Sequence, residues 1–214
     1  GVVEGLSEDD IVINMSTNSP NATEKVDQII QEAGGRFIDS PVSGTVGPAE
    51  EGTLTILASG DDEDIDEVRH LLEAMGEPVV NCGETGQGTN MKLFINLLLG
   101  DMMQAFSEAL AFGKSKDLEL EKLLKVVDSS ACDSPMFRAK GEQIKERDFE
   151  SRFALKLLSK DVNLATSAAG EENVPMPVTS ATRESLNQAE SLNLGDEDIA
   201  SLIKNFEKIT GEEI

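Results

Sequence analysis

A lysine and an asparagine four residues apart form the pair in this sequence that is best suited to acid–base chemistry. They belong to the motif GQGTNMKLFIN, residues 86–96, in which two glycines permit a tight loop and a polar pair precedes an apolar run. Lys92 and Asn96 therefore fall on one face of a predicted helix, one turn apart. Partial desolvation on such a helix lowers the pKa of a lysine, which makes Lys92 a candidate general acid or base. The alternative is a solvent-facing lysine that begins a core helix.

A second candidate is the segment DSPVSGTVGPAEEG, residues 39–52, which directly follows a strand-like run. We expect it to be a turn without regular secondary structure. Ser43 beside Gly44 can present a hydroxyl and backbone N–H groups to a carboxylate. An ordinary connection rich in Pro, Gly and Ser is the alternative.

Other polar residues have simpler interpretations. Ser19 before Pro20 is typical of a helix cap, and Lys160-Asp161 within an apolar helix is typical of a salt bridge at the rim of a core. His70, the only histidine, lies in an acidic segment that we predict to be exposed. Neither a Ser-His-Asp triad nor a metal cluster can be argued from this composition.

The elements that must position these residues change in character near Gly86. Before it, short apolar runs alternate with helical patterns, which favours an α/β layer with parallel strands. We predict strands at 11–14, 36–39, 54–58 and 78–81, and helices at 21–33 and 65–75.

After Gly88 only helical patterns occur. The first, from Asn90 to about Lys116, is apolar nearly all round and is predicted to be buried. Pro135 and Pro177 stand at first-turn positions of later helices. These later helices are predicted at 119–129, 135–145, 153–169, 177–192 and 196–209. We predict two domains, 1–86 and 87–214, joined by the long helix.

Charge and cysteine content limit the classes of protein that fit. The 214 residues include 41 acidic and 18 basic side chains, and the formal charge of −23 argues against a nucleic-acid or anionic-membrane surface. Two distant cysteines give no disulfide framework, and no apolar run approaches the ~20 residues of a membrane span. We expect a cytoplasmic protein. Because the first residue is Gly1, we also expect a processed chain or a piece of a longer one.

Five motifs in order carry a resemblance over nearly the whole chain. They are MSTNSP, DSPVSGTVGPAEEGTL, GQGTNMKLFIN, KDVNLA and PMP. Together they resemble the β-hydroxyacid dehydrogenase family, which includes 3-hydroxyisobutyrate dehydrogenase and tartronate semialdehyde reductase. The segments PAEEGTLTILASGD, MMQAFSEALAFG and SPMFRAKG are most similar to its glyoxylate/succinic semialdehyde reductase branch.

The resemblance implies a fold and a role for individual residues. The fold would be part of a Rossmann-like α/β domain followed by an all-α domain like the C-terminal domain of 6-phosphogluconate dehydrogenase. Lys92 matches the family's catalytic lysine and Asn96 a substrate-holding asparagine. Ser43 and Gly44 match the substrate-carboxylate loop. The residues that match cofactor contacts are Thr17, Phe153 and Lys160, the last of which would help to lower the pKa of Lys92.

The chain also departs from the family pattern. Thr45 stands where many relatives have a second glycine, and the strand and GxGxxG turn that grip a dinucleotide are absent, so we expect impaired cofactor binding. The implied activity is NAD(P)-dependent reduction of a small aldehyde acid such as glyoxylate or succinic semialdehyde, with a lean toward NADP. The implied partners are a carboxylate-bearing substrate and further copies of the chain, as a dimer or tetramer. A non-catalytic oligomerisation scaffold of the same fold is the competing hypothesis.

Overall fold

The computed structural model describes residues 1–214, which divide into two compact units. Unit 1 comprises Gly1–Asn96 and Ser167–Asn173, and unit 2 comprises Leu97–Thr166 and Val174–Ile214. The long helix α4 (Gln87–Lys114) contributes residues to both units without interruption. The domain boundary near Gly86 therefore stays a prediction.

Unit 1 is an α/β unit with two small sheets. Its strands are β1 (Ile11–Asn14), β2 (Arg36–Asp39), β3 (Val42–Ser43), β4 (Thr55–Ala58) and β5 (Val79–Asn81), and its helices before α4 are η1 (Val2–Gly5), α1 (Pro20–Glu32), α2 (Val46–Glu51) and α3 (Asp62–Met75). β1 pairs with β2 and β4 with β5 in parallel, whereas β3 pairs with β4 in antiparallel fashion. The predicted α/β layer with parallel strands is confirmed.

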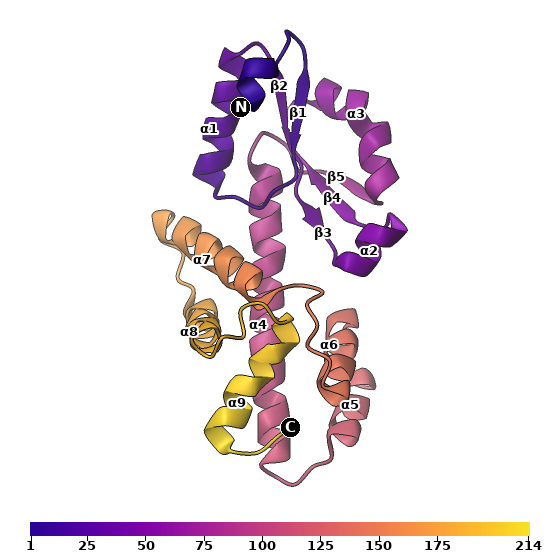
Figure 1. The fold of residues 1–214 in the computed structure, drawn as a ribbon, viewed down its shortest axis with the longest axis vertical. Coiled ribbons are helices and arrows are strands. Elements are labelled where there is room, and N and C mark those ends of the chain that lie inside the picture. Colours follow the sequence, from indigo (N-terminus) through magenta and orange to yellow (C-terminus); the bar gives the residue numbers. More distant parts are fainter. The chain divides into compact units, whose positions relative to one another are not determined.

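The core of unit 1 lies between these strands and helix α3. It consists of Ile38, Ile56, Ala58, Ile65, Val68 and Leu72, all buried. Helices α1 and α3 lie on opposite sides of strands β1 and β2 (Figure 1). Helix α3 begins at a side-chain cap, because Asp61 accepts the Glu63 N–H at 2.9 Å.

The segment 39–52 is more regular than we predicted. It contains β3, whose Ser43 lies opposite Thr55 of β4, and the short helix α2, which ends at Gly52 in the left-handed conformation (φ 65°). The prediction of a turn without regular structure is therefore wrong. A two-residue strand has too little pattern to be seen in sequence, and its pairing depends on β4.

Unit 2 is entirely helical, as predicted. Beyond α4 it contains α5 (Leu120–Asp128), α6 (Pro135–Glu146), α7 (Leu155–Glu171, whose last residues belong to unit 1), α8 (Pro177–Ser191), η2 (Ile199–Leu202) and α9 (Ile203–Thr210). Pro135 and Pro177 begin their helices. The single helix predicted at 196–209 is instead the 3₁₀ turn η2 followed by α9.

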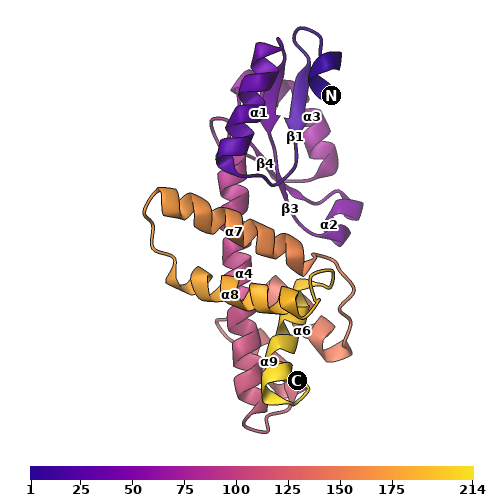
Figure 2. The ribbon, with the colours of Figure 1, turned by 60° about the vertical axis from the view of Figure 1, so that its left-hand side comes forward.

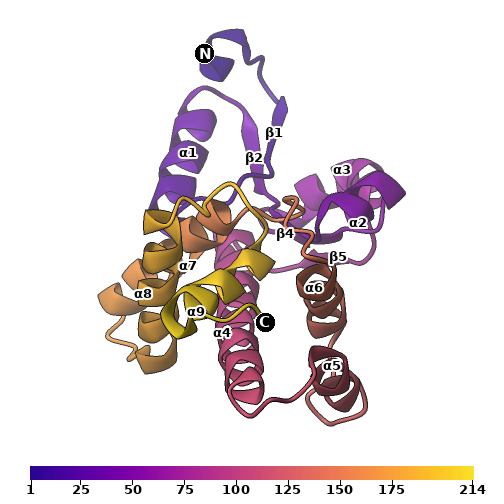
Figure 3. The same ribbon diagram turned by 60° about the horizontal axis from the view of Figure 1, so that its bottom comes forward.

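One large apolar cluster holds unit 2 together. Met103, Phe106 and Leu110 of α4 contribute to it, and the Phe106 ring stacks on the Phe137 ring with centroids 4.6 Å apart. Helices α5 and α6 lie side by side (Figure 3), and α8 packs against α9 and η2 (Figure 2). No helix is both long enough and apolar enough to span a membrane.

Candidate active site

The first turn of α4 is anchored by residues at the ends of two distant strands, Asp39 in β2 and Ser59 just after β4. The Thr89 N–H donates to Asp39 Oδ2 at 2.7 Å, and the Gly88 N–H donates to Ser59 Oγ at 2.9 Å. These contacts satisfy N–H groups that have no partner inside a helix. Helix α4 therefore begins at Gln87, three residues before the Asn90 start that we predicted.

Lys92 and Asn96 lie on one face of α4, in agreement with their spacing. Lys92 Nζ donates to Asn96 Oδ1 at 3.1 Å. Asn96 is buried, with 2% of its surface exposed, and Lys92 is partly buried. An ammonium group held by a buried amide is suited to hydrogen bonding with a substrate oxygen and to donating a proton to it.

Ser43 and Gly44 lie where β3 ends. Ser43 is partly buried and is fixed by pairing with Thr55. Gly44 has φ 148°, and a Cβ at this position would lie 2.5 Å from Leu54 Cδ2 and 3.1 Å from Pro48 Cβ. Only glycine fits this turn without strain, so its shape is closely defined.

Thr17 lies in the loop between β1 and α1, at the carboxyl end of β1. Ser19 ends this loop and caps α1, because its Oγ accepts the Ala22 N–H at 3.2 Å, as predicted. Open α/β sheets bind ligands at the carboxyl ends of their strands. Two side-chain atoms at this edge, Asn14 Nδ2 and Ser40 Oγ, are buried without a hydrogen-bond partner in the protein. Such atoms fit a polar ligand.

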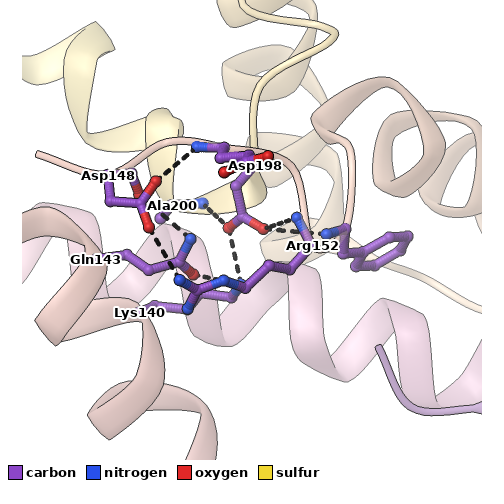
Figure 4. A network of polar contacts seen from close by, with 8 residues as sticks. Lys140, Gln143, Asp148, Arg152, Asp198 and Ala200 are labelled. Atoms are coloured by element: carbon purple, nitrogen blue, oxygen red, sulfur yellow. Dashed lines mark hydrogen bonds and ion pairs between the residues drawn. The ribbon is translucent and has the colours of Figure 1, made fainter. Parts of the chain in front are cut away.

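Phe153 belongs to unit 2, where the Asp198 carboxylate holds its backbone. Figure 4 shows Asp198 and its ion-pair partner Lys140. Asp198 Oδ2 accepts the N–H groups of Arg152 and Phe153, each at 3.0 Å. Asp198 Oδ1 accepts from Lys140 Nζ at 2.8 Å, and Gln143 accepts from the same amino group at 2.8 Å. Lys140 and Asp198 are 5% and 0% exposed, so this network fixes the segment that carries Phe153.

Lys160 also belongs to unit 2. Its Nζ lies 3.0 Å from Asp161 Oδ1, and its side chain is 46% exposed against 4% for Asp161. This matches the ion pair at the rim of a core that we expected from the sequence. The roles of Thr17, Phe153 and Lys160 at the cofactor stay predictions.

Asp39 is the member of this region whose role we did not predict. It is fully buried, and burial raises the pKa of its carboxyl group, whereas hydrogen bonds from Thr89 and Ser59 act in the opposite direction. Two signals in the sequence could have pointed to it: an acidic residue directly after the apolar residues of a strand, and a threonine in the first turn of an apolar helix. No cluster of three or more His, Cys, Asp or Glu side chains could hold a metal ion.

Two family models together match nearly the whole chain. Residues 1–84 match the NAD binding domain of 6-phosphogluconate dehydrogenase, and residues 86–206 match the model described as NAD-binding of NADP-dependent 3-hydroxyisobutyrate dehydrogenase. Both models describe proteins that bind a nicotinamide dinucleotide. The predicted cofactor class, NAD or NADP, is confirmed.

Individual relatives agree with the models. The chain is 38% identical over 204 residues to glyoxylate/succinic semialdehyde reductase 1 of Arabidopsis thaliana, covering 95% of this chain and 71% of the relative. It is 34% identical over 212 residues to 2-(hydroxymethyl)glutarate dehydrogenase of Eubacterium barkeri, covering 99% and 70%. Among solved structures, 3-hydroxyisobutyrate dehydrogenase from Salmonella typhimurium is similar with a TM-score of 0.89 and 26% identity, covering 95% of this chain and 72% of that one.

The fold and these matches define a class, the NAD(P)-dependent oxidoreductases with an α/β unit followed by a helical unit. Within it, the chain belongs to the β-hydroxyacid dehydrogenase family. The resemblance that the five motifs indicated is confirmed.

Proposed function

We propose that this chain carries the substrate-binding and proton-transfer residues of an enzyme that reduces a small aldehyde acid, such as glyoxylate or succinic semialdehyde. The observation that carries the proposal is the Lys92–Asn96 pair, with Nζ and Oδ1 3.1 Å apart on the first turns of α4. The start of this helix is anchored to Asp39, four residues before Ser43 in the chain. The name of the Arabidopsis thaliana relative supports the choice of substrate class.

Four residues of unit 1 bind the substrate or take part in proton transfer in this proposal. Ser43 and the backbone at Gly44 bind the carboxylate of the substrate. Lys92 donates a hydrogen bond to the carbonyl oxygen and delivers the proton that turns it into a hydroxyl. Asn96 accepts a hydrogen bond from Lys92 and so holds the amino group in place. The dinucleotide, when bound, supplies the hydride that reaches the carbonyl carbon.

The residues proposed for cofactor binding are Thr17, Phe153 and Lys160. Thr17 would help to hold the dinucleotide at the β1–α1 loop, and Phe153 and Lys160 are the further residues that would hold it in this proposal. We favour NADP over NAD. The 214 residues contain no GxGxxG motif, so we expect this chain by itself to bind the dinucleotide weakly.

We further propose that the enzyme is cytoplasmic and assembles as a dimer or tetramer through its helical unit. The strongly acidic composition argues against a nucleic-acid or anionic-membrane partner, and a small carboxylate-bearing substrate would need locally placed donors such as Lys92 and Ser43.

Substrate preference tests the proposed function directly. NADPH and NADH oxidation is followed with glyoxylate, succinic semialdehyde and a neutral aldehyde of similar length. The assay uses the 214 residues and, in parallel, a fusion with a GxGxxG strand–turn–helix unit placed before Gly1. We expect turnover of both aldehyde acids and little turnover of the neutral aldehyde. Equal kcat/KM for acid and neutral aldehydes would refute the carboxylate site.

Two further results sharpen this test. Ser43→Ala should raise KM for the aldehyde acids by about tenfold and leave kinetics with the neutral aldehyde unchanged, because one hydrogen bond to a charged group is lost. Absence of turnover by a folded, cofactor-bound fusion would favour the alternative, a non-catalytic scaffold of the same fold.

A further inference from the structure

A single buried carboxyl group connects four segments of unit 1. Asp39 ends β2, and its Oδ2 and Oδ1 accept from the Thr89 N–H (2.7 Å) and the Thr89 hydroxyl (3.0 Å). Ser59, just after β4, lies 3.4 Å from Oδ2 and accepts the Gly88 N–H. Thr23 of α1 joins the network, with its Oγ1 3.1 Å from Thr89 Oγ1. Asp39, Ser59, Thr23 and Thr89 are all 0% exposed.

This network takes the place of a local helix cap. The first N–H groups of a helix need acceptors, which usually come from a side chain just before the helix. For α4 the acceptors come instead from Asp39 and Ser59, fifty and twenty-nine residues away in sequence from the groups that they bind. The start of α4 is therefore located by the ends of β2 and β4.

The same carboxyl group contacts the helix that carries Lys92 and belongs to a residue that precedes the Ser43–Gly44 turn in the chain. Lys92 follows Thr89 by three residues, so both lie on the same side of the first turns of α4. Asp39 is also the residue from which the chain continues through Pro41 into β3 and Ser43. Pro41 is held in turn, because its carbonyl accepts the Leu57 N–H at 2.9 Å.

We propose that Asp39 is a positioning residue that fixes the Lys92 amino group relative to the carboxylate-binding turn at Ser43 and Gly44. The proposal rests on the proposed function of those residues. Asp39 acts through the Thr89 contacts and takes no part in proton transfer. Displacement of a catalytic group by about 1 Å is enough to lower a rate on the order of 100-fold.

The test compares two substitutions at one position. Asn keeps a carbonyl oxygen for the Thr89 N–H and places an amide N–H₂ toward the Thr89 hydroxyl, whereas Ala removes both partners. Asp39→Ala should lower kcat for the aldehyde acid about 100-fold. It should also speed hydrogen exchange at the Thr89 amide. Asp39→Asn should restore most of kcat and of the Thr89 protection.

Leu72→Ala is the matched control for lost stability. Leu72 lies in the core of unit 1, fully buried, and has no part in the network. Measured where each variant is folded, Leu72→Ala should keep the kcat of the unchanged chain. An equal loss of kcat in Leu72→Ala and Asp39→Ala would overturn the positioning role. So would an Asp39→Asn variant that is as slow as Asp39→Ala while its Thr89 amide stays protected.

Two more variants test the positioning role of Asp39 separately from the proposed function. If Asp39→Ala does not fold, Thr89→Val removes the hydroxyl contact and keeps the amide contact, with an expected loss of kcat of about tenfold. Unchanged kcat in Thr89→Val would then overturn the proposal. Lys92→Ala separates the two claims: full turnover in Lys92→Ala refutes the proposed function, whereas low turnover in Lys92→Ala with normal turnover in Asp39→Ala refutes only the positioning role.

Discussion

Gly88 in the first turn of α4 gives a sharp prediction, because helix propensity and packing predict opposite effects of adding one methyl group. In an ordinary helix interior, Gly→Ala stabilises the folded chain by roughly 1 kcal/mol. At Gly88, however, a Cβ would lie 2.4 Å from the Leu57 carbonyl oxygen, 2.8 Å from the Asp39 carbonyl oxygen and 3.0 Å from Ser59 Oγ. Two of these atoms are backbone and cannot rotate away.

The expected magnitude follows from these contacts. Overpacking of a closely packed site costs about 1–3 kcal/mol and occasionally more, which exceeds the gain in propensity. We therefore expect Gly88→Ala to lower the free energy of unfolding by about 2 kcal/mol. The helix start would have to move away from β2 and β4, so kcat should fall as well.

Gly170→Ala is the matched control within the same unit. Gly170 lies in α7, and a Cβ there would meet nothing within 4 Å. This variant should be unchanged or more stable by up to about 1 kcal/mol. Urea unfolding, followed by circular dichroism, measures the free energy of unfolding of both variants. A Gly88→Ala variant as stable as Gly170→Ala would refute the close approach of α4 to the strands.

Two predictions concern other buried charges. Lys140→Met leaves the Asp198 carboxylate buried without its cation and should lower the free energy of unfolding, measured in urea, by about 3–5 kcal/mol. Lys145→Met loses only exposed ion pairs, with Glu142 and Glu121, and should change the free energy of unfolding by less than about 1 kcal/mol. Similar losses in the two variants would contradict this. Because burial raises the pKa of Asp39, the folded chain binds more protons than the unfolded chain between the ordinary carboxyl pKa of about 3.9 and the raised value. The free energy of unfolding of the unchanged chain should therefore fall, relative to that of Asp39→Asn, as pH rises through this window. Urea unfolding at several pH values measures this difference, and a difference that does not change with pH would contradict the prediction.

The sequence predicted the alternating strands and helices of unit 1 and the helices of unit 2 because each has its own local pattern. It did not reveal β3 or α2. The two residues of β3 form a strand because Val42 and Ser43 lie opposite residues 56 and 55 of β4. The start of α4 was also placed too late, since its caps, Asp39 and Ser59, are distant in sequence from the helix that they cap.

For the candidate site, too, the sequence predicted local relations between residues but not contacts between residues that are distant in sequence. The spacing of Lys92 and Asn96 predicted their shared helix face, and the hydrogen bond between them agrees with it. The five motifs indicated the family, which the matches confirm. The anchoring role of Asp39 depends on contacts between residues fifty positions apart, so the sequence could mark Asp39 and Thr89 as unusual but could not pair them.

The measurement that tests the account most directly is the turnover number of Lys92→Ala with NADPH and an aldehyde acid. Lys25→Ala on α1, an exposed lysine of the same unit, is the control and should keep the kcat of the unchanged chain. If Lys92 delivers the proton, its removal should lower kcat by roughly 10²–10⁴-fold, with the fold intact by circular dichroism. A folded Lys92→Ala variant with the kcat of Lys25→Ala would contradict the central claim.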